Sequence, residues 1–268
     1  MTFRFFYYTI ALSWLGFALA SYMPKFGNAI FLLAVFMPAL VAIWLTGTKQ
    51  GEAGLRALFA RVFEWRVGWK WYVFAIGYML AIRLAAAAIQ RLATGTWPQF
   101  GNESWFLIPM AIAISMPVQA GEEIGWRGYA LPRLGAKFGY GIGSAILGAL
   151  WALWHLPVFF MLPGNGNYGQ SFPLFFLGVI PLSIAMGWLF VNTKGSILLA
   201  MLMHATVNNT HDIVQSGYAA VSPLSLNTTL VAWLTIALLW IGAAYFLVRL
   251  KETGRGRARV RLPGETPS

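Results

Sequence analysis

The sequence predicts an all-α membrane protein that crosses a bilayer about eight times. Of its 268 residues, 59% are hydrophobic and only 10% are charged, whereas about a quarter of the residues in soluble domains are charged. The hydrophobic residues form runs of about 17 to 25, the length that a helix needs to span a bilayer. These observations exclude a soluble globular protein. They predict one transmembrane domain over residues 1–250, followed by a basic, disordered cytoplasmic tail over 251–268.

The spans are assigned in chain order from hydropathy. The first is a retained helix rather than a cleaved signal peptide, because only Arg4 precedes it and no small-residue cleavage site follows. The fourth is extended to residue 133 with a bend at Pro117, so that its acidic residues reach the middle of the bilayer. The predicted spans cover residues 5–23, 28–46, 71–92, 105–133, 140–162, 172–192, 195–210 and 229–249.

A short amphipathic helix is expected between the second and third spans. Its apolar residues recur with helical period while its arginines lie off that stripe, as in a helix on a membrane surface. Such a helix would anchor the chain at the inner surface or gate an opening to the cytoplasm. The apolar positions are Leu55, Leu58, Phe59, Val62 and Phe63, and the arginines are Arg56, Arg61 and Arg66.

Lys and Arg are distributed unevenly among the segments between the spans. Fifteen of the 19 fall on the side that holds both termini, whereas only Lys25 and Arg91 fall on the other side. Because Lys and Arg concentrate in cytoplasmic segments, both termini are predicted to be cytoplasmic. Compact loops and the lack of an organellar targeting segment favour a multi-pass protein of a bacterial cytoplasmic membrane.

The charge and the cysteine count restrict the partners. The net charge of +11 comes from residues between apolar runs and in the C-terminal segment, which favours anionic headgroups of the lipid bilayer and not nucleic acid. The chain has no cysteine, which excludes disulfides, thiolate metal sites and cysteine nucleophiles.

Two adjacent glutamates interrupt the fourth span. Glu123 and Arg127 are four positions apart, so they share a helix face in the order that favours an ion pair. Glu122 points about 100° away from Glu123 and lacks such a partner. A poorly solvated carboxylate beside another carboxylate is suited to act as a general base or acid. The alternative is a charged cap at the inner end of the span.

Histidines interrupt two other spans. His155 is a lone polar residue in an apolar stretch, which by itself is more typical of a hydrogen-bonded core residue. His204 and Asn208 are four positions apart and share a helix face, where they could form interhelical hydrogen bonds. At a rise of about 1.5 Å per residue, however, both histidines and Glu122 reach similar depths near the middle of the bilayer.

A carboxylate, two imidazoles and an amide that meet inside a membrane suggest water activation with oxyanion stabilisation, and hydrolysis is the natural reaction class. The sequence has no His-Glu-x-x-His pattern for zinc-dependent cleavage. Asp212 is the sole aspartate and cannot form an aspartate dyad, and no Gly-x-Ser-Gly element is present. Among intramembrane hydrolase chemistries, the glutamate and histidine route remains.

The ordered motifs resemble those of the CPBP family of intramembrane proteases, which groups type II CAAX prenyl endopeptidases with bacterial Abi-type, bacteriocin-processing proteins. The family often has Phe where this chain has Trp151, so the aromatic character is retained. The motifs lie within residues 121–209 and read Glu122-Glu123-x-x-x-Arg127, Trp151-x-x-x-His155 and His204-x-x-x-Asn208.

The resemblance implies peptide-bond hydrolysis within the bilayer. It gives water activation to Glu122 and His155, oxyanion binding to His204 and Asn208, and a supporting pair to Glu123 and Arg127. If a zinc ion is bound, its ligands would be Glu122, His155 and His204, although the same groups can act without metal. The sequence places no carboxylate behind either histidine, which favours metal-independent action.

The expected substrate is a membrane-associated protein or peptide, and prenylated CAAX cleavage is not the favoured native reaction. Two other function classes stay open. One is a non-catalytic bacteriocin-immunity or membrane-partner-binding protein that uses the same cavity. The other is a small transporter with Glu122 as proton carrier and Arg83 as substrate contact, although no inverted repeat supports it.

Overall fold

The computed structural model of the protein describes residues 2–101, 104, 106–210, 213–214 and 222–256, and these ranges form helices and loops with no β-strand beyond one isolated bridge. Six helical segments within them are long and apolar enough to cross a membrane. They are α1 (Thr2–Tyr22), α2 (Gly27–Ala60), α3 (Trp69–Thr94), α7 with α8 (Tyr140–Trp154 and Leu156–Met161), α9 (Phe172–Asn192) and α11 (Leu230–Gly256).

Two predicted spans take a different form. The seventh is the shorter apolar helix α10 (Ile197–Asn209). The fourth is a continuous but irregular helical path that ends at Phe138, five residues beyond the predicted end. It comprises α4 (Leu107–Ser115), the 3₁₀ turn η1 (Met116–Gln119), α5 (Ala120–Glu123), the π-helical turn η2 (Ile124–Ala130) and α6 (Leu131–Phe138). With these two elements, the prediction of an all-α protein with about eight membrane helices is confirmed.

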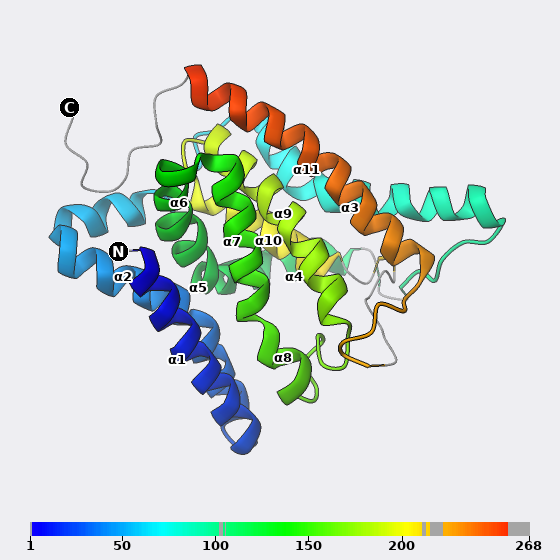
Figure 1. Cartoon of the computed structure of the whole chain (residues 1–268), viewed down its shortest axis with the longest axis horizontal. Coiled ribbons are helices and arrows are strands. Elements are labelled where there is room, and N and C mark those ends of the chain that lie inside the picture. The colour runs from blue at the N-terminus through cyan, green and yellow to red at the C-terminus, as the bar shows by residue number, and fades with distance from the viewer. Residues whose placement is uncertain (1, 102–103, 105, 211–212, 215–221, 257–268) are drawn as a thin grey trace.

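Figure 1 shows how the helices are arranged around this irregular segment. The helices α1 and α2 form a hairpin that projects from the rest of the bundle, while α9 packs against both α7 and α11. At Gly51 the backbone adopts φ 62°, which separates the membrane part of α2 from its last turns. These last turns coincide with the first part of the amphipathic helix expected from the sequence and end at Ala60, before Val62 and Phe63; within them Leu58 is buried and Phe59 is exposed.

Glycines allow α2 to lie against the irregular segment. A Cβ atom on Gly125 would come within 2.6 Å of the backbone of Pro38, and one on Gly121 would lie 2.9 Å from the ring of Phe36. Two small residues four positions apart on one helix face permit such close approach in membrane proteins. The glycines that flank Glu122 and Glu123 therefore fix the distance between α2 and the acidic residues.

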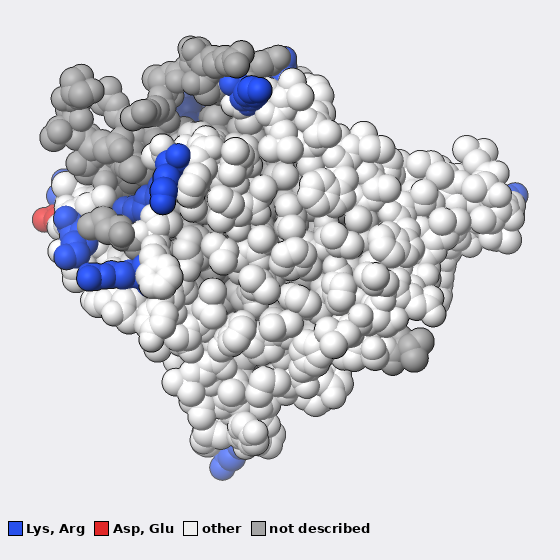
Figure 2. Space-filling view, viewed as in Figure 1, with Lys and Arg blue, Asp and Glu red and all other residues white. Residues whose placement is uncertain are grey.

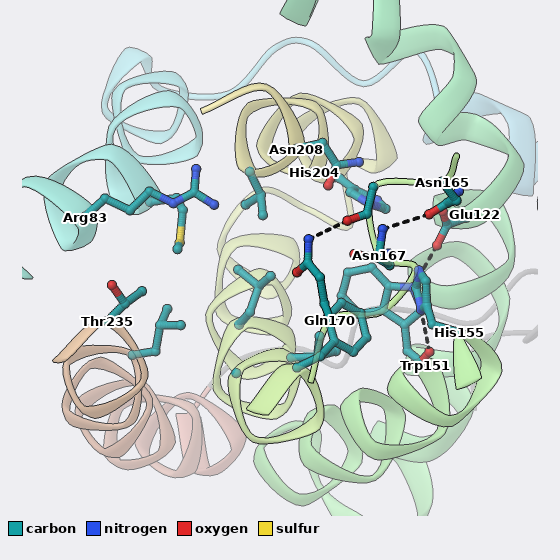
Figure 3. A pocket seen from close by; sticks show the side chains of 18 residues that line it. Arg83, Glu122, Trp151, His155, Asn165, Asn167, Gln170, His204, Asn208 and Thr235 are labelled. Atoms are coloured by element: carbon teal, nitrogen blue, oxygen red, sulfur yellow. Dashed lines mark hydrogen bonds between the residues drawn. The ribbon is translucent and has the colours of Figure 1, made fainter. Parts of the chain in front are cut away.

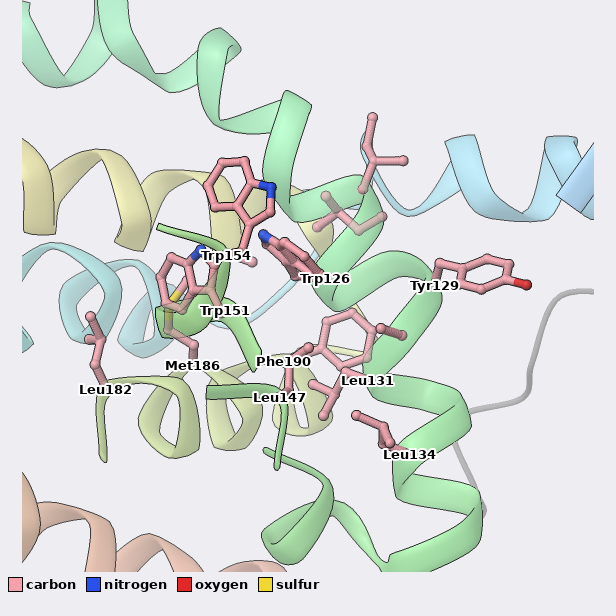
Figure 4. Close-up of a cluster of buried hydrophobic side chains, with 14 of the residues drawn as sticks. Trp126, Tyr129, Leu131, Leu134, Leu147, Trp151, Trp154, Leu182, Met186 and Phe190 are labelled. Atoms are coloured by element: carbon pink, nitrogen blue, oxygen red, sulfur yellow. The ribbon is translucent and has the colours of Figure 1, made fainter. Parts of the chain in front are cut away.

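A large apolar core surrounds the acidic segment from the other side. Trp126, Tyr129 and Leu131 are buried against residues of α7 and α9, such as Leu147 and Phe190 (Figure 4). Because Trp126 is fully buried and lies edge-on to Trp154 with ring centroids 5.8 Å apart, the turn that follows the glutamates is held by aromatic packing.

Lys and Arg side chains gather at one end of the molecule, where α1 begins and where α2 and α11 end, while the middle of the visible face carries none (Figure 2). This asymmetry agrees with the distribution along the sequence. At the C-terminus, α11 continues to Gly256, five residues past the predicted start of a tail at Lys251, and residues 257–268 lie outside the described ranges.

Candidate active site

The two adjacent glutamates lie in α5, between the 3₁₀ turn and the π-helical turn, and both are buried. Pro117 lies in the first positions of η1 and lacks an N–H group, so the helix is tightened just before the glutamates. Single π-helical turns are frequent at functional sites. The acidic residues thus sit where the helix departs from regular geometry on both sides.

Glu122 binds two indole groups. Its Oε2 accepts a hydrogen bond of 2.7 Å from Nε1 of Trp151 and one of 3.4 Å from Nε1 of Trp126. Within the part of the chain that the structure describes, no cation pairs with Glu122. Its carboxylate instead faces a cavity.

Glu123 is the centre of a buried ionic network. Its Oε1 accepts from Nη1 of Arg127 at 2.7 Å and from Nδ1 of His204 at 2.8 Å. The side chains of Glu123 and Arg127 are fully buried, and a buried charge of this kind is stable only when it is paired and hydrogen-bonded. Glu123 therefore binds both His204 and Arg127 through one carboxylate oxygen.

Arg127 is held by further contacts from α7 and α9. Its guanidinium lies over the ring of Trp151, 4.4 Å from the centroid, and Nη2 lies 3.1 Å from Sδ of Met186. Stacking on an aromatic face and a planar hydrogen-bonding fork are properties that lysine lacks. Trp151 thus contacts Glu122 by its N–H group and Arg127, the partner of Glu123, by its ring.

His155 lies at the end of α7, where the helix breaks before Pro157. The backbone N–H of His155 donates to the carbonyl of Ala152, so the carbonyl of Trp151 is left without its usual helical donor. Nδ1 of His155 lies 2.9 Å from this carbonyl oxygen. Because a carbonyl only accepts, Nδ1 carries the hydrogen and Nε2 of the neutral ring is an acceptor.

His204 and Asn208 lie on α10, whose start is fixed by a capping hydroxyl. Oγ of Ser196 accepts from the backbone N–H of Leu199 at 3.1 Å. His204 is buried beside Trp151, with the two rings nearly perpendicular and their centroids 5.1 Å apart, whereas Asn208 is more exposed. Since Nδ1 of His204 donates to Glu123, its Nε2 is the nitrogen left for other partners.

Two cavities meet at these residues. The larger, of about 460 Å³, is lined by Glu122, His155, His204 and Asn208 and reaches Arg83 at its far side (Figure 3). The smaller, of about 200 Å³, opens toward apolar residues of α1 and α2. The residues that line both are Glu122, His155, Asn165, Asn167 and Asn208. The structure therefore brings the four predicted catalytic residues to one cavity, with Glu123 and Arg127 directly behind it.

Several residues of this site could not be predicted from the sequence. Asn165, Asn167 and Gln170, in the loop between α8 and α9, line the larger cavity, and Oδ1 of Asn165 accepts the backbone N–H of Asn167 at 3.0 Å. The sequence does not distinguish polar site residues in a loop from other loop residues, because loops are polar in general. The role of Trp126 and Trp151 as indole donors could not be predicted either, since tryptophan in an apolar span is usually a packing residue.

Glu122, His155 and His204, the predicted ligands of a metal, line one cavity. As the side chains are arranged, no three His, Asp or Glu residues within the described ranges lie close enough together to hold a metal ion. The expectation that no carboxylate lies behind either histidine is wrong, because Glu123 lies behind His204. The chemistry of the site is therefore derived from the side chains alone.

Comparisons with known proteins point to the same segment. Residues 103–210 match the family of Rce1-like type II CAAX prenyl endopeptidases. The protein named CAAX prenyl protease 2 of Methanococcus maripaludis is 33% identical to this chain over 101 residues. This alignment covers 35% of the chain and 36% of the relative, so about a third of the relative's length is matched. The family match contains all six predicted site residues.

Proposed function

We propose that the protein is an intramembrane endopeptidase, because its central segment matches the family of Rce1-like type II CAAX prenyl endopeptidases. It hydrolyses a peptide bond of a membrane-associated protein or peptide. The observation that carries the proposal is the meeting of Glu122, His155 and His204 at one cavity inside a helical membrane bundle.

Glu122 is the general base in this proposal. Oε1 accepts no hydrogen bond from the described residues, while Oε2 is occupied by two indole groups. Oε1 takes a proton from a water molecule, and the resulting hydroxide attacks the carbonyl carbon of the scissile bond. Nε2 of His155 is an acceptor in the neutral ring. It accepts a hydrogen bond from the second hydrogen of the water, which stays on the oxygen, and so orients the water. The proton on Glu122 then passes to the leaving amine nitrogen as the C–N bond breaks.

His204 and Asn208 bind the oxyanion of the tetrahedral intermediate. The amide of Asn208 donates from Nδ2, and His204 donates from Nε2 when its ring is an imidazolium. In that form both ring nitrogens donate, Nδ1 to Glu123 and Nε2 to the oxyanion. The buried network of Arg127, Glu123 and His204 supports this role because it fixes the ring in one orientation.

The substrate class is proposed from the cavities and the relative. The name of the relative assigns it a prenylated CAAX protein substrate, and about a third of its length is matched. For this chain we propose the broader class of membrane-associated proteins or peptides, of which a farnesylated CAAX peptide is a usable probe. The larger cavity, of about 460 Å³, lies within the size range of ligand-binding pockets.

The proposal also covers how the chain is oriented in the membrane and which membrane contains it. We propose that both termini lie in the cytoplasm, because Lys and Arg gather at the end of the molecule that holds the start of α1 and the end of α11. A bacterial cytoplasmic membrane is the proposed location. The partner of this basic end is the anionic surface of the bilayer.

The function is tested by comparing membranes that contain the wild-type protein or Glu122→Gln. The wild-type protein is expected to generate a shortened membrane-associated protein and to cleave a farnesylated CAAX peptide, whereas Glu122→Gln does neither. Glu52→Gln, which changes an exposed glutamate outside the site, is the control and retains cleavage. Equal product from wild type and Glu122→Gln would contradict the proposal.

A further inference from the structure

Two tryptophans bind the carboxylate that the proposed mechanism uses as base. The donors come from different elements, Trp126 from η2 and Trp151 from α7, and both N–H groups reach the same oxygen, Oε2 of Glu122. An indole offers one donor and no acceptor. Hydrogen bonds from indole groups to a buried carboxylate therefore leave its negative charge in place, whereas a cation would pair with it.

The two contacts determine how the carboxylate is oriented. Because Trp151 and Trp126 hold Oε2, rotation of the carboxylate group is restricted and Oε1 is the oxygen left to face the cavity. The rings themselves are fixed. Trp126 is fully buried beside Phe5, and the ring of Trp151 contacts the guanidinium of Arg127 and lies nearly perpendicular to the ring of His204. A donor that is itself held by packing gives a preorganised site.

We infer that Trp151 and Trp126 are positioning residues for Glu122: they fix which carboxylate oxygen accepts the proton of water. The inference rests on the proposed function. It assigns the larger effect to Trp151, because its hydrogen bond is 2.7 Å long and that of Trp126 is 3.4 Å long, and hydrogen bonds weaken as they lengthen.

Substitution by phenylalanine separates positioning from packing. Trp151→Phe keeps an aromatic ring over Arg127 but removes the donor, and it is expected to lower kcat about ten-fold, the effect of losing one charge-assisted hydrogen bond. KM for a farnesylated CAAX peptide should change by less than about two-fold. Trp126→Phe should lower kcat by less than Trp151→Phe and yet lower Tm by more, because Trp126 is packed by more aromatic rings.

Trp154→Phe is the matched control. Trp154 is as deeply buried as the other two, but its Nε1 is a buried donor without a hydrogen-bond partner among the described residues. The substitution therefore removes a similar ring volume without removing a hydrogen bond. Its effect on Tm measures the cost of packing alone.

Infrared spectroscopy observes the hydrogen bond without substrate. The chain has only eight Asp and Glu residues, so the difference between wild type and Glu122→Gln isolates the carboxylate bands of Glu122. The difference between Trp151→Phe and Trp151→Phe/Glu122→Gln should show the Glu122 carboxylate bands at shifted frequencies. The corresponding difference for Trp154→Phe should show them at the wild-type frequencies.

These measurements can overturn the inference. If Trp151→Phe leaves both kcat and the Glu122 bands unchanged, the tryptophans are packing residues only. If the bands move but the wild-type protein cleaves neither the peptide nor any membrane protein, the proposed function fails while the indole contacts to Glu122 stand.

Discussion

Replacing each of the adjacent glutamates by glutamine tests how the site divides its functions. Glu122→Gln keeps an acceptor for the two indole groups but cannot take a proton from water. It should lower turnover by about 10² to 10⁴-fold, the usual contribution of positioned proton transfer, with little change in Tm because no ion pair is broken.

Glu123→Gln should affect stability and turnover together. Arg127 is fully buried and would lose its counter-ion, and breaking a buried pair costs about 3 to 5 kcal/mol. Because the glutamine oxygen can still accept from Arg127, we expect about 2 to 3 kcal/mol, which corresponds to about 5 to 10 °C in Tm. Turnover should fall about 10²-fold, since His204 loses the carboxylate that holds it as an oxyanion donor.

The double variant Glu123→Gln/Arg127→Gln separates these two effects. It should regain much of the lost Tm, because the stranded guanidinium is gone, but its turnover should stay low, because His204 still lacks a carboxylate. Glu52→Gln is the matched control: Glu52 and Arg56 have the same spacing and a distance of 2.6 Å but are exposed, so Tm should change by about 1 °C or less.

Purified variants in detergent or liposomes are assayed by thermal unfolding and by cleavage of a farnesylated CAAX peptide. The reasoning fails if Glu122→Gln retains near-normal turnover. It also fails if the double variant recovers turnover with stability, because the carboxylate behind His204 would then have no role of its own.

Three further predictions concern packing, topology and metal. Gly125→Ala should lower Tm by about 3 to 10 °C, since its Cβ would meet the backbone of Pro38; Gly77→Ala, at a helical glycine with open space around it, should not lower Tm. A reporter that is active only outside the membrane, fused after Ser268, should give no signal, and a strong signal would reverse the proposed topology. Turnover should survive exhaustive chelation, as expected for side-chain chemistry; zinc bound at one ion per chain, whose removal abolishes turnover and whose return restores it, would refute this.

The spans could be predicted because length and hydropathy are local properties of the chain. The irregularity of the fourth span could be predicted only in part. Pro117 signals a bend by its chemistry, but the π-helical turn at Ile124–Ala130 has no such marker. It forms where Gly125 lies against Pro38 and Trp126 is enclosed by aromatic rings, and these are contacts between distant segments.

The candidate site likewise contains residues that could be predicted from the sequence and residues that could not. Polar residues are rare in apolar spans, so Glu122, His155 and His204 could be selected from the sequence as residues that require a reason to be there. Their partners could not. The hydrogen bond between Trp151 and Glu122 joins positions 29 apart, and the one between His204 and Glu123 joins positions 81 apart. No helical spacing relates such residues, and only the packing of α7 and α10 on the acidic segment brings them together.

The adjacency of the two glutamates has a physical consequence for the proposed mechanism. Successive residues of a helix point about 100° apart, so Glu122 faces the cavity while Glu123 faces the buried Arg127. A cation within reach of the base would hold its lone pairs and compete with water for them. The site keeps Arg127 on the second glutamate and, among the described residues, gives the first only neutral indole donors. Exchanging the roles would require the helix to rotate by one residue, and Gly121 and Gly125, closely packed against α2, prevent that rotation.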